Sequence, residues 1–159
     1  MARATQTRNG DKPLDAIALL KQDHRTVEQL FEQFEETEDG EGIPIAQRVC
    51  QLLTIHAQIE EEIFYPAVKQ TLEDEELVPE ALVEHGSLKA LIAQVEGVNP
   101  EGEMFDAKIK VMCEFVKHHV KEEQNEMFPK AQKTRLDMNE LGVQLAERKE
   151  QLLVEKGAA

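Results

Sequence analysis

Two segments of the chain each place a glutamate four residues after a histidine and end on an aromatic residue followed by proline. The first pairs His56 with Glu60, and the second pairs His119 with Glu123. On an α-helix, positions four residues apart lie on the same face, so each segment presents an imidazole and a carboxylate in one direction. Such nitrogen and oxygen donors suit iron, manganese or zinc. Two such helices facing each other would form a metal site inside a helical core.

The two segments belong to a longer internal repeat. The match continues upstream at a constant offset of 63 residues, where Cys50 aligns with Cys113. An earlier pair of segments repeats at an offset of 61, where Asp23-His24 aligns with Glu84-His85. Each half of the chain therefore carries a lone histidine and then a His-x-x-x-Glu segment, which predicts a pair of helices repeated once.

Four of the five histidines lie in the middle of apolar stripes on separate predicted helices. A single histidine in such a stripe is more often a hydrogen-bonded core residue than a metal ligand. Here two of the four have a glutamate on the same stripe, and an unpaired buried carboxylate is costly unless a cation neutralises it. We therefore predict six metal ligands: His24, His56, Glu60, His85, His119 and Glu123.

The fifth histidine offers an alternative register, because His118 also has a glutamate four residues later, Glu122. The proline offset decides against it: His56 precedes Pro66 by ten residues, and His119 precedes Pro129 by ten. One residue of shift turns a helical side chain by about 100°. His119 and Glu123 are therefore preferred as the ligand pair.

The residues near the predicted ligands receive plainer interpretations. Tyr65 and Phe128 are interpreted as core residues, with a redox relay as the alternative for both. Cys50 and Cys113 are interpreted as small core residues. Asp23 and Glu84 are expected at the surface, although each could accept a hydrogen bond from a ligand imidazole.

Apolar residues at spacings of three and four predict the helices that position these groups. We expect helices at 13–38, from Pro44 through the first His-x-x-x-Glu segment, at 79–96, at 103–130 and, more weakly, at 136–154. Pro66 should kink the second helix or open its last turns, and Pro129 repeats it. The inward positions include Ile63 and Ala67 on the second helix and Leu82 on the third. The predicted division is a loosely held tail at 1–12, a bundle at 13–132, and a C-terminal amphipathic helix with a tail at 133–159.

Composition restricts the class of protein. The chain has 159 residues, of which 31% are charged and 4% aromatic, and this length and composition favour one all-helical domain. Its net charge of −14 argues against nucleic acid and anionic membranes as partners. No stretch approaches the roughly 20 apolar residues of a membrane span, and no secretory signal is apparent. Two cysteines on different predicted helices do not indicate a disulfide framework, so a cytoplasmic location is expected.

This combination of motifs resembles the hemerythrin-like HHE cation-binding family over about residues 14–130. The residues that carry the resemblance are Asp23-His24, His56-x-x-x-Glu60 with Phe64-Tyr65-Pro66, Glu84-His85, and His119-x-x-x-Glu123 with Phe128-Pro129. The resemblance implies an up-down-up-down four-helix bundle, here with an additional C-terminal helix, around two iron ions joined by an oxo or hydroxo bridge. His24 and His56 would bind one iron, His85 and His119 the other, and Glu60 and Glu123 would bridge them.

Two departures from the oxygen-carrying members bear on function. Those proteins have a second histidine one turn after the third-helix ligand, where this chain has Lys89, and their last carboxylate is an aspartate five residues after the final histidine rather than Glu123 at four. Each iron would then keep an open position. The expected function is binding or processing of O2, peroxide or NO, or sensing of iron or redox state, with peroxide- or NO-directed catalysis left open. The alternative is a metal-stabilised regulatory module that meets a protein partner through residues 136–154.

Overall fold

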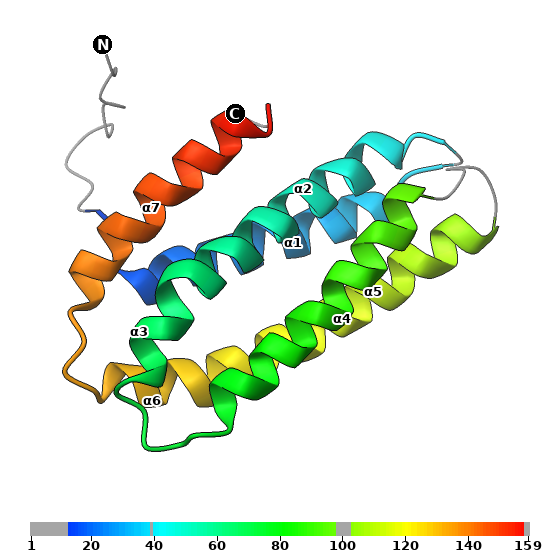
Figure 1. Cartoon of the computed structure of the whole chain (residues 1–159). Helices are drawn as coiled ribbons and strands as arrows, with labels where there is room; N and C mark the ends of the chain where they lie inside the picture. The colour runs from blue at the N-terminus through cyan, green and yellow to red at the C-terminus, as the bar shows by residue number, and fades with distance from the viewer. Residues whose placement is uncertain (1–12, 39, 98–102, 158–159) are drawn as a thin grey trace, which may run out of the picture.

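The computed structural model describes residues 13–38, 40–97 and 103–157. The predicted all-helical class and bundle are confirmed. Four long helices form the bundle, and a fifth lies against α1 and α2 (Figure 1). The long helices are α1 (Ala16–Glu35), α2 (Ile43–Ile59), α4 (Leu77–Gly97), α5 (Glu103–Glu122) and the additional α7 (Met138–Glu155). The short helices α3 (Tyr65–Lys69) and α6 (Phe128–Gln132) extend the second and fourth bundle helices.

Side-chain caps fix where α1 and α7 begin. The carboxylate of Asp15 accepts a hydrogen bond from the backbone N–H of Ala18 at 2.8 Å, so α1 begins at Ala16 rather than near residue 13. Asp137 caps α7 in the same way through the N–H groups of Asn139 and Glu140. The third bundle helix begins at Leu77, two residues earlier than expected, because its proline falls in the first turn, where no N–H is needed.

Two π-helical turns interrupt the second and fourth bundle helices, and each begins at the glutamate of a predicted ligand pair. They are η1 (Glu60–Phe64) and η2 (Glu123–Met127). The N–H of Tyr65 bonds to the carbonyl of Glu60, five residues back. Pro66 has no N–H to continue the regular pattern, so the turn before it can widen. Pro129 follows η2 at the same distance, and both prolines therefore accompany opened turns, as expected for Pro66.

The widened turn corrects the predicted inward positions after Glu60. A π-helical turn holds one more residue than an α-helical turn, so the buried positions move one residue along the chain. Phe64 and Val68 are fully buried, whereas Ile63 and Ala67 are only half-buried. The expectation for Leu82 was also wrong: it is 41% exposed, and Ala81 takes the inward position at 5% exposure.

The apolar core falls into two clusters on either side of the polar ligand layer. One contains residues from η1, α3, η2 and α6 together with Leu20 and Ala81. The other contains Val27, Leu88, Val116 and their neighbours towards the far end of the bundle. The predicted ligands of α1, α4 and α5 lie between these two clusters along their helices. Cys50 and Cys113 are buried and free, as expected for small core residues.

The apolar face of α7 is buried within the chain itself. Leu141, Leu145 and Leu152 belong to the core cluster that also contains Ile55. Gly142 allows the closest approach, because a Cβ there would lie 2.3 Å from the backbone oxygen of Leu14. The weak amphipathic pattern at 136–154 is therefore satisfied by packing on the bundle, and a protein partner at this helix stays a prediction.

Some expectations lie outside the described residues or remain untested. The tail predicted at 1–12 and the last two residues of the chain are not described. The division of the chain near residue 132 stays a prediction. Among the helices of the described residues, none is long and apolar enough to cross a membrane.

Candidate metal centre

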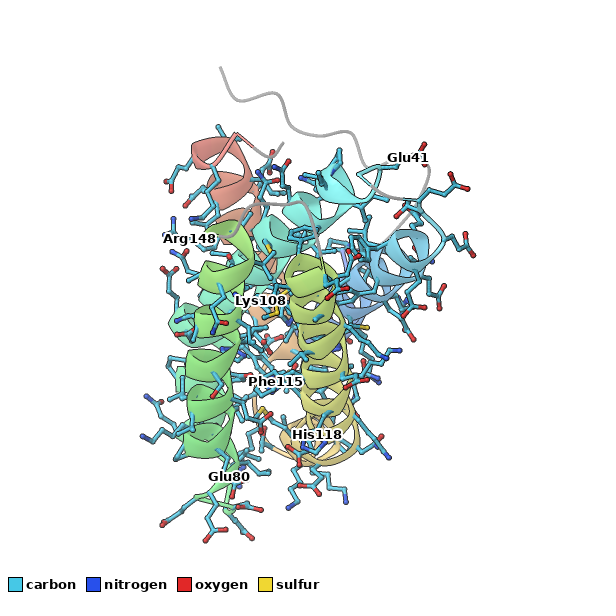
Figure 2. All side chains as sticks on the ribbon, turned by 90° about the vertical axis from the view of Figure 1, so that its right-hand side faces the viewer. Glu41, Glu80, Lys108, Phe115, His118 and Arg148 are labelled. Carbon is cyan, nitrogen blue, oxygen red and sulfur yellow. The ribbon has the colours of Figure 1, made fainter. Side chains whose placement is uncertain are left out.

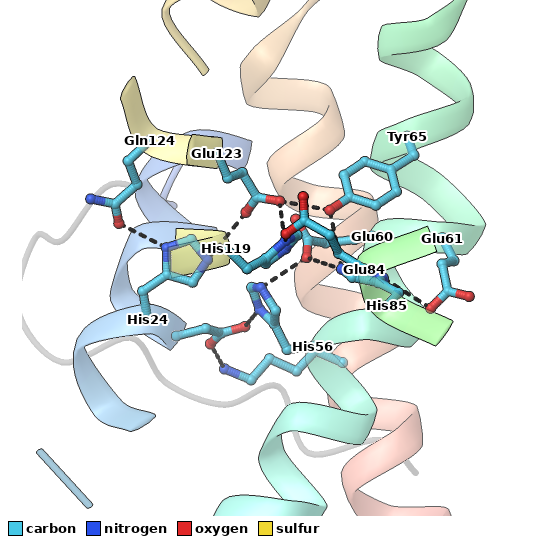
Figure 3. A network of polar contacts seen from close by, with 12 residues as sticks. His24, His56, Glu60, Glu61, Tyr65, Glu84, His85, His119, Glu123 and Gln124 are labelled. Carbon is cyan, nitrogen blue, oxygen red and sulfur yellow. Dashed lines mark hydrogen bonds and ion pairs between the residues drawn. The ribbon is translucent and has the colours of Figure 1, made fainter. Parts of the chain in front are cut away.

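The structure brings all six predicted ligands together in one buried layer. Each of them is at most 7% exposed, although all six are polar or charged. They come from six different elements of the bundle: His24 from α1, His56 from α2, Glu60 from η1, His85 from α4, His119 from α5 and Glu123 from η2. Figure 3 shows the imidazoles and carboxylates converging from both halves of the bundle. Their role as metal ligands stays a prediction.

Each carboxylate lies between imidazoles of different helices. Glu60 Oε1 is 2.9 Å from His56 Nε2 and 3.5 Å from His85 Nε2. Glu123 Oε1 is 3.2 Å from His24 Nε2, and its Oε2 is 3.4 Å from His119 Nε2.

The donor atoms sort into two groups, each with two imidazoles and one carboxylate. We call His24, His56 and Glu123 the first donor group, and Glu60, His85 and His119 the second. Within each group the donor atoms lie within 4.8 Å of one another. Because each carboxylate also contacts an imidazole of the other group, both glutamates are placed to bridge two cations.

Six buried polar atoms of this layer lack a hydrogen-bond partner among the described residues. They are Nε2 of His24, His56 and His119, both oxygens of Glu60, and Oε1 of Glu123. Some lie within ion-pair distance of each other, but their angles do not make hydrogen bonds. Buried polar atoms without partners are costly. Bound cations would satisfy all six at once, so the residues present fit a two-metal site.

The outer nitrogen of every imidazole in the layer is held by an oxygen. His24 Nδ1 lies 2.7 Å from Gln124 Oε1, and His85 Nδ1 lies 3.2 Å from Glu61 Oε2. The other two contacts are His56 Nδ1 to Asp23 Oδ2 and His119 Nδ1 to Glu84 Oε2, both at 2.9 Å. An oxygen acceptor keeps the hydrogen on Nδ1 and leaves the lone pair of Nε2 facing inward. This is the tautomer that a metal requires.

The expected surface position of Asp23 was wrong. Asp23 is 8% exposed, holds His56 and also contacts the ammonium of Lys149 on α7. Burial raises the pKa of this carboxyl, but His56 and Lys149 outweigh burial and lower it. Glu84 is half-buried and orients His119 in the same way. Both residues take the alternative role of orienting a predicted ligand.

Tyr65 is the residue whose importance the sequence interpretation missed. Its hydroxyl donates a hydrogen bond to Glu123 Oε2 at 2.6 Å and lies 3.1 Å from His85 Nε2. Burial and the carboxylates of Glu60 and Glu123 raise the pKa of Tyr65 well above its usual value, so the phenol keeps its proton. Its counterpart Phe128 packs as expected: its ring stacks on the ring of His24, with 6.0 Å between the two ring centroids. The single hydroxyl in Tyr65-Pro66, absent from Phe128-Pro129, was the available signal.

The electrostatics of the layer favour protonated imidazoles when no metal competes. Burial opposes charge on His119, but Glu123, Glu60 and Glu84 outweigh it and raise its pKa to about 9. His56 follows the same pattern, with burial opposed by Glu60 and Asp23, and its pKa lies well above the usual value. Burial raises the pKa of Glu123, but His119 and His24 hold it well below its usual value. Binding of a cation would therefore displace protons from this layer.

His118 and Glu122 do not reach the ligand layer. Their side chains are 67% and 46% exposed and form a surface ion pair with each other at 3.2 Å. Figure 2 shows His118 at the outer surface of α5. The geometry therefore agrees with the preferred register of the fourth bundle helix.

A small cavity adjoins the four imidazoles, on the side of the core cluster that contains Val27, Leu88 and Val116. Its apolar wall consists of Val27, Leu53, Ala57, Leu88, Val116 and Val120. It has room for about one water-sized molecule. A larger hollow lies elsewhere, around Phe34 and Phe105, and none of the six predicted ligands lines it.

Comparison with known proteins agrees with the helical fold and gives the family. The family model for the hemerythrin HHE cation binding domain matches residues 15–131. The crystal structure of a hemerythrin HHE cation binding domain-containing protein from Mycobacterium kansasii superposes with a TM-score of 0.79 at 21% identity, over 89% of each chain. A DNA nickase from Nostoc sp. is 26% identical over 124 residues, which cover 77% of this chain but only 35% of the nickase. The chain therefore belongs to the hemerythrin HHE cation-binding family.

Proposed function

We propose that the protein binds two iron ions in the ligand layer and uses them on a small molecule such as O2, peroxide or NO. The observation that carries this proposal is the set of six buried imidazole and carboxylate atoms that have no hydrogen-bond partner among the described residues, beside four imidazoles whose outer nitrogens are already held. His24 and His56 would hold one ion, and His85 and His119 the other. Glu60 and Glu123 would contact both.

Two features of the donor set are those of a non-heme iron site. Each donor group contains two imidazoles and one carboxylate, the combination that non-heme iron proteins use with positions left open. The described part of the layer offers no thiolate, because Cys50 and Cys113 lie in the apolar core cluster that contains Val27. Bound iron would supply a redox-active Lewis acid.

The protein side chains would orient the donors and limit what reaches them. Asp23, Glu61, Glu84 and Gln124 keep the four imidazoles turned inward. The proton of Tyr65 is held at the phenol oxygen and directed at Glu123. The adjoining cavity has apolar walls and room for about one water-sized molecule, which favours a diatomic molecule or peroxide over a larger substrate.

Metal analysis with a visible spectrum tests the proposal. Protein produced in iron-sufficient medium without added metal should contain about two iron ions per chain. It should show the near-ultraviolet and visible absorption of ferric iron, and this absorption should change on mixing with peroxide or NO. Stoichiometric zinc, or protein without metal, would contradict the proposal.

A second candidate function is metal-dependent regulation through α7. The contact from Lys149 to Asp23 favours it, because Asp23 in turn holds the predicted ligand His56. Loss of metal would then loosen α7 and expose its apolar face to a partner. Limited proteolysis distinguishes the two candidates: a regulator should show iron-dependent cleavage near residues 133–137 without turnover of peroxide or NO.

We propose no action on DNA. The named nickase is nearly three times as long as the matched segment, so its activity need not reside in the shared part. The net charge of −14 also opposes binding to a phosphate backbone. An electrophoretic mobility shift with this chain at low salt would contradict this view.

A further inference from the structure

We propose, on the basis of the proposed function, that the second donor group binds its metal more tightly than the first. The six inner residues are nearly symmetric between the halves of the bundle. The residues that hold the outer nitrogens are not. The difference lies in the charge behind each imidazole.

Both imidazoles of the second donor group are backed by carboxylates. His85 Nδ1 contacts Glu61 Oε2 at 3.2 Å, and His119 Nδ1 contacts Glu84 Oε2 at 2.9 Å. Lys89 pairs with the other oxygen of Glu61, but its side chain is 53% exposed, so solvent screens its charge. The outer partners of this group therefore carry a net charge of −1.

Only one imidazole of the first donor group is backed by a carboxylate. His56 contacts Asp23, whose other oxygen contacts Lys149. Lys149 is only 27% exposed and lies against a buried aspartate, so its charge is less screened than that of Lys89. His24 contacts the neutral amide oxygen of Gln124 at 2.7 Å. The net charge of the outer partners is therefore zero.

Negative charge behind an imidazole makes it a stronger metal donor. A carboxylate acceptor on Nδ1 raises the basicity of Nε2, and loss of such an outer partner typically weakens metal binding by about 10–100-fold. An amide oxygen accepts the same hydrogen bond without the full charge. The second donor group should therefore fill first, and the first donor group should hold the more easily lost metal.

One pair of equivalent positions isolates this effect. Glu61 and Gln124 are separated by the repeat offset of 63, follow Glu60 and Glu123 directly, and hold equivalent imidazoles. Glutamate and glutamine have nearly the same shape. Exchanges at these two positions therefore alter charge with little change in packing.

Cobalt(II) titration of the metal-free full-length chain tests the inference. The d–d absorption and a competing chelator report each step of binding. In the unaltered chain we expect two ions, with dissociation constants at least about 10-fold apart. E61Q should weaken the tighter step by about 10-fold or more, and Q124E should strengthen the weaker step by a similar factor. E122Q, at an exposed position outside the layer, is the matched control and should leave both steps unchanged.

The outcomes separate the two proposals. Fewer than two bound cobalt ions per chain would overturn the two-metal site itself. Two ions bound with equal affinity would overturn the inequality, and a Q124E chain with unchanged affinities would overturn the charge of the outer partners as its cause. Either result would leave the two-metal site standing. Circular dichroism checks that each variant is folded. In the iron-loaded chain, Mössbauer spectroscopy should give two distinct quadrupole doublets, and Q124E should bring them closer together.

Discussion

The two halves of the bundle differ where α7 covers one of them. Ile55 and His118 occupy equivalent positions of the repeat, one residue before a predicted ligand histidine. Ile55 is 1% exposed and shares a core cluster with Leu145 of α7. His118 is exposed and forms an ion pair with Glu122. The predicted ligands are therefore the same residue types in both halves. The residues just outside them differ between the halves according to what packs against them.

The difference has a physical basis. An inner ligand must be a histidine or carboxylate in both halves if both are to hold a metal, so few residue types are acceptable there. An outer position has only to match its local surroundings. Tyr65 and Phe128 lie against the ligand layer without being predicted ligands, and they too are free to differ: both fill equivalent buried space, and only the tyrosine adds a hydrogen bond to Glu123.

Removal of metal should affect both halves alike and have the largest effect. A ligand bound only by the native state stabilises it by roughly 4 kcal/mol for each site when its concentration is a thousand times the dissociation constant. Chelation should therefore lower the thermal midpoint, measured by circular dichroism. Hydrogen exchange should increase in both η1 and η2. Equal midpoints with and without iron would show that neither half depends on metal.

Loss of one bridging glutamate should also affect both halves. Glu123 contacts imidazoles of both donor groups, so Glu123→Ala should reduce iron content from about two ions to less than one per chain. Glu60→Ala should do the same from the other half. Glu122→Ala, measured beside them by metal analysis, should retain wild-type content. Retention of both ions by Glu123→Ala would show that the glutamate is not a ligand.

Loss of one histidine should affect only one donor group. His119→Ala should remove about one iron ion, or most of the visible absorption, because it removes one of three donors of the second group. His118→Ala should leave metal content close to wild type, since His118 is exposed. The opposite result would place the register of α5 one residue away.

The pH dependence of the metal-free protein should reveal the same charge pattern in both halves. The pKa of His119 is raised to about 9 and that of His56 well above normal, so both groups stabilise the fold while protonated. That stability is complete below pH 6.5, the ordinary histidine value, and is lost as pH rises through about 9, by up to roughly 3 kcal/mol for His119. Urea unfolding of chelated protein at several pH values measures it. Stability that increases from pH 6.5 to 9 would contradict these pKa directions.

Tyr65→Phe should have the smallest effect and should make the first half resemble the second at this position. It removes the phenol donor from Glu123 at the cost of about 1.5–3 kcal/mol of stability, the usual effect of a lost hydrogen bond to a charged group. The midpoint of urea unfolding should fall without a change in slope. If stability is unchanged, the hydrogen bond from the Tyr65 hydroxyl to Glu123 contributes nothing to the free energy of unfolding.

The sequence allowed the class of fold and the positions of the six polar residues to be predicted, because both depend on spacing along helices. His56 with Glu60 and His119 with Glu123 share a face whatever surrounds them. The inward positions after Glu60 were predicted one residue too early along the chain. The segment from His56 to Pro66 is too short for its apolar spacing to reveal the changed hydrogen bonds of a widened turn. Asp23 was misplaced for another reason: its burial depends on Lys149, which is 126 residues away in the sequence. Contacts between distant helices cannot be read from local periodicity.

The widened turns also affect how this chain should be compared with others. A sequence alignment against a regular helix needs a one-residue gap just after Glu60 and another just after Glu123, because each π-helical turn contains the extra residue. An alignment without gaps would pair Tyr65 with an outward position and hide its hydroxyl from any search for shared site residues. Both halves carry the widened turn at the same repeat position, so a comparison of the two halves with each other needs no gap there.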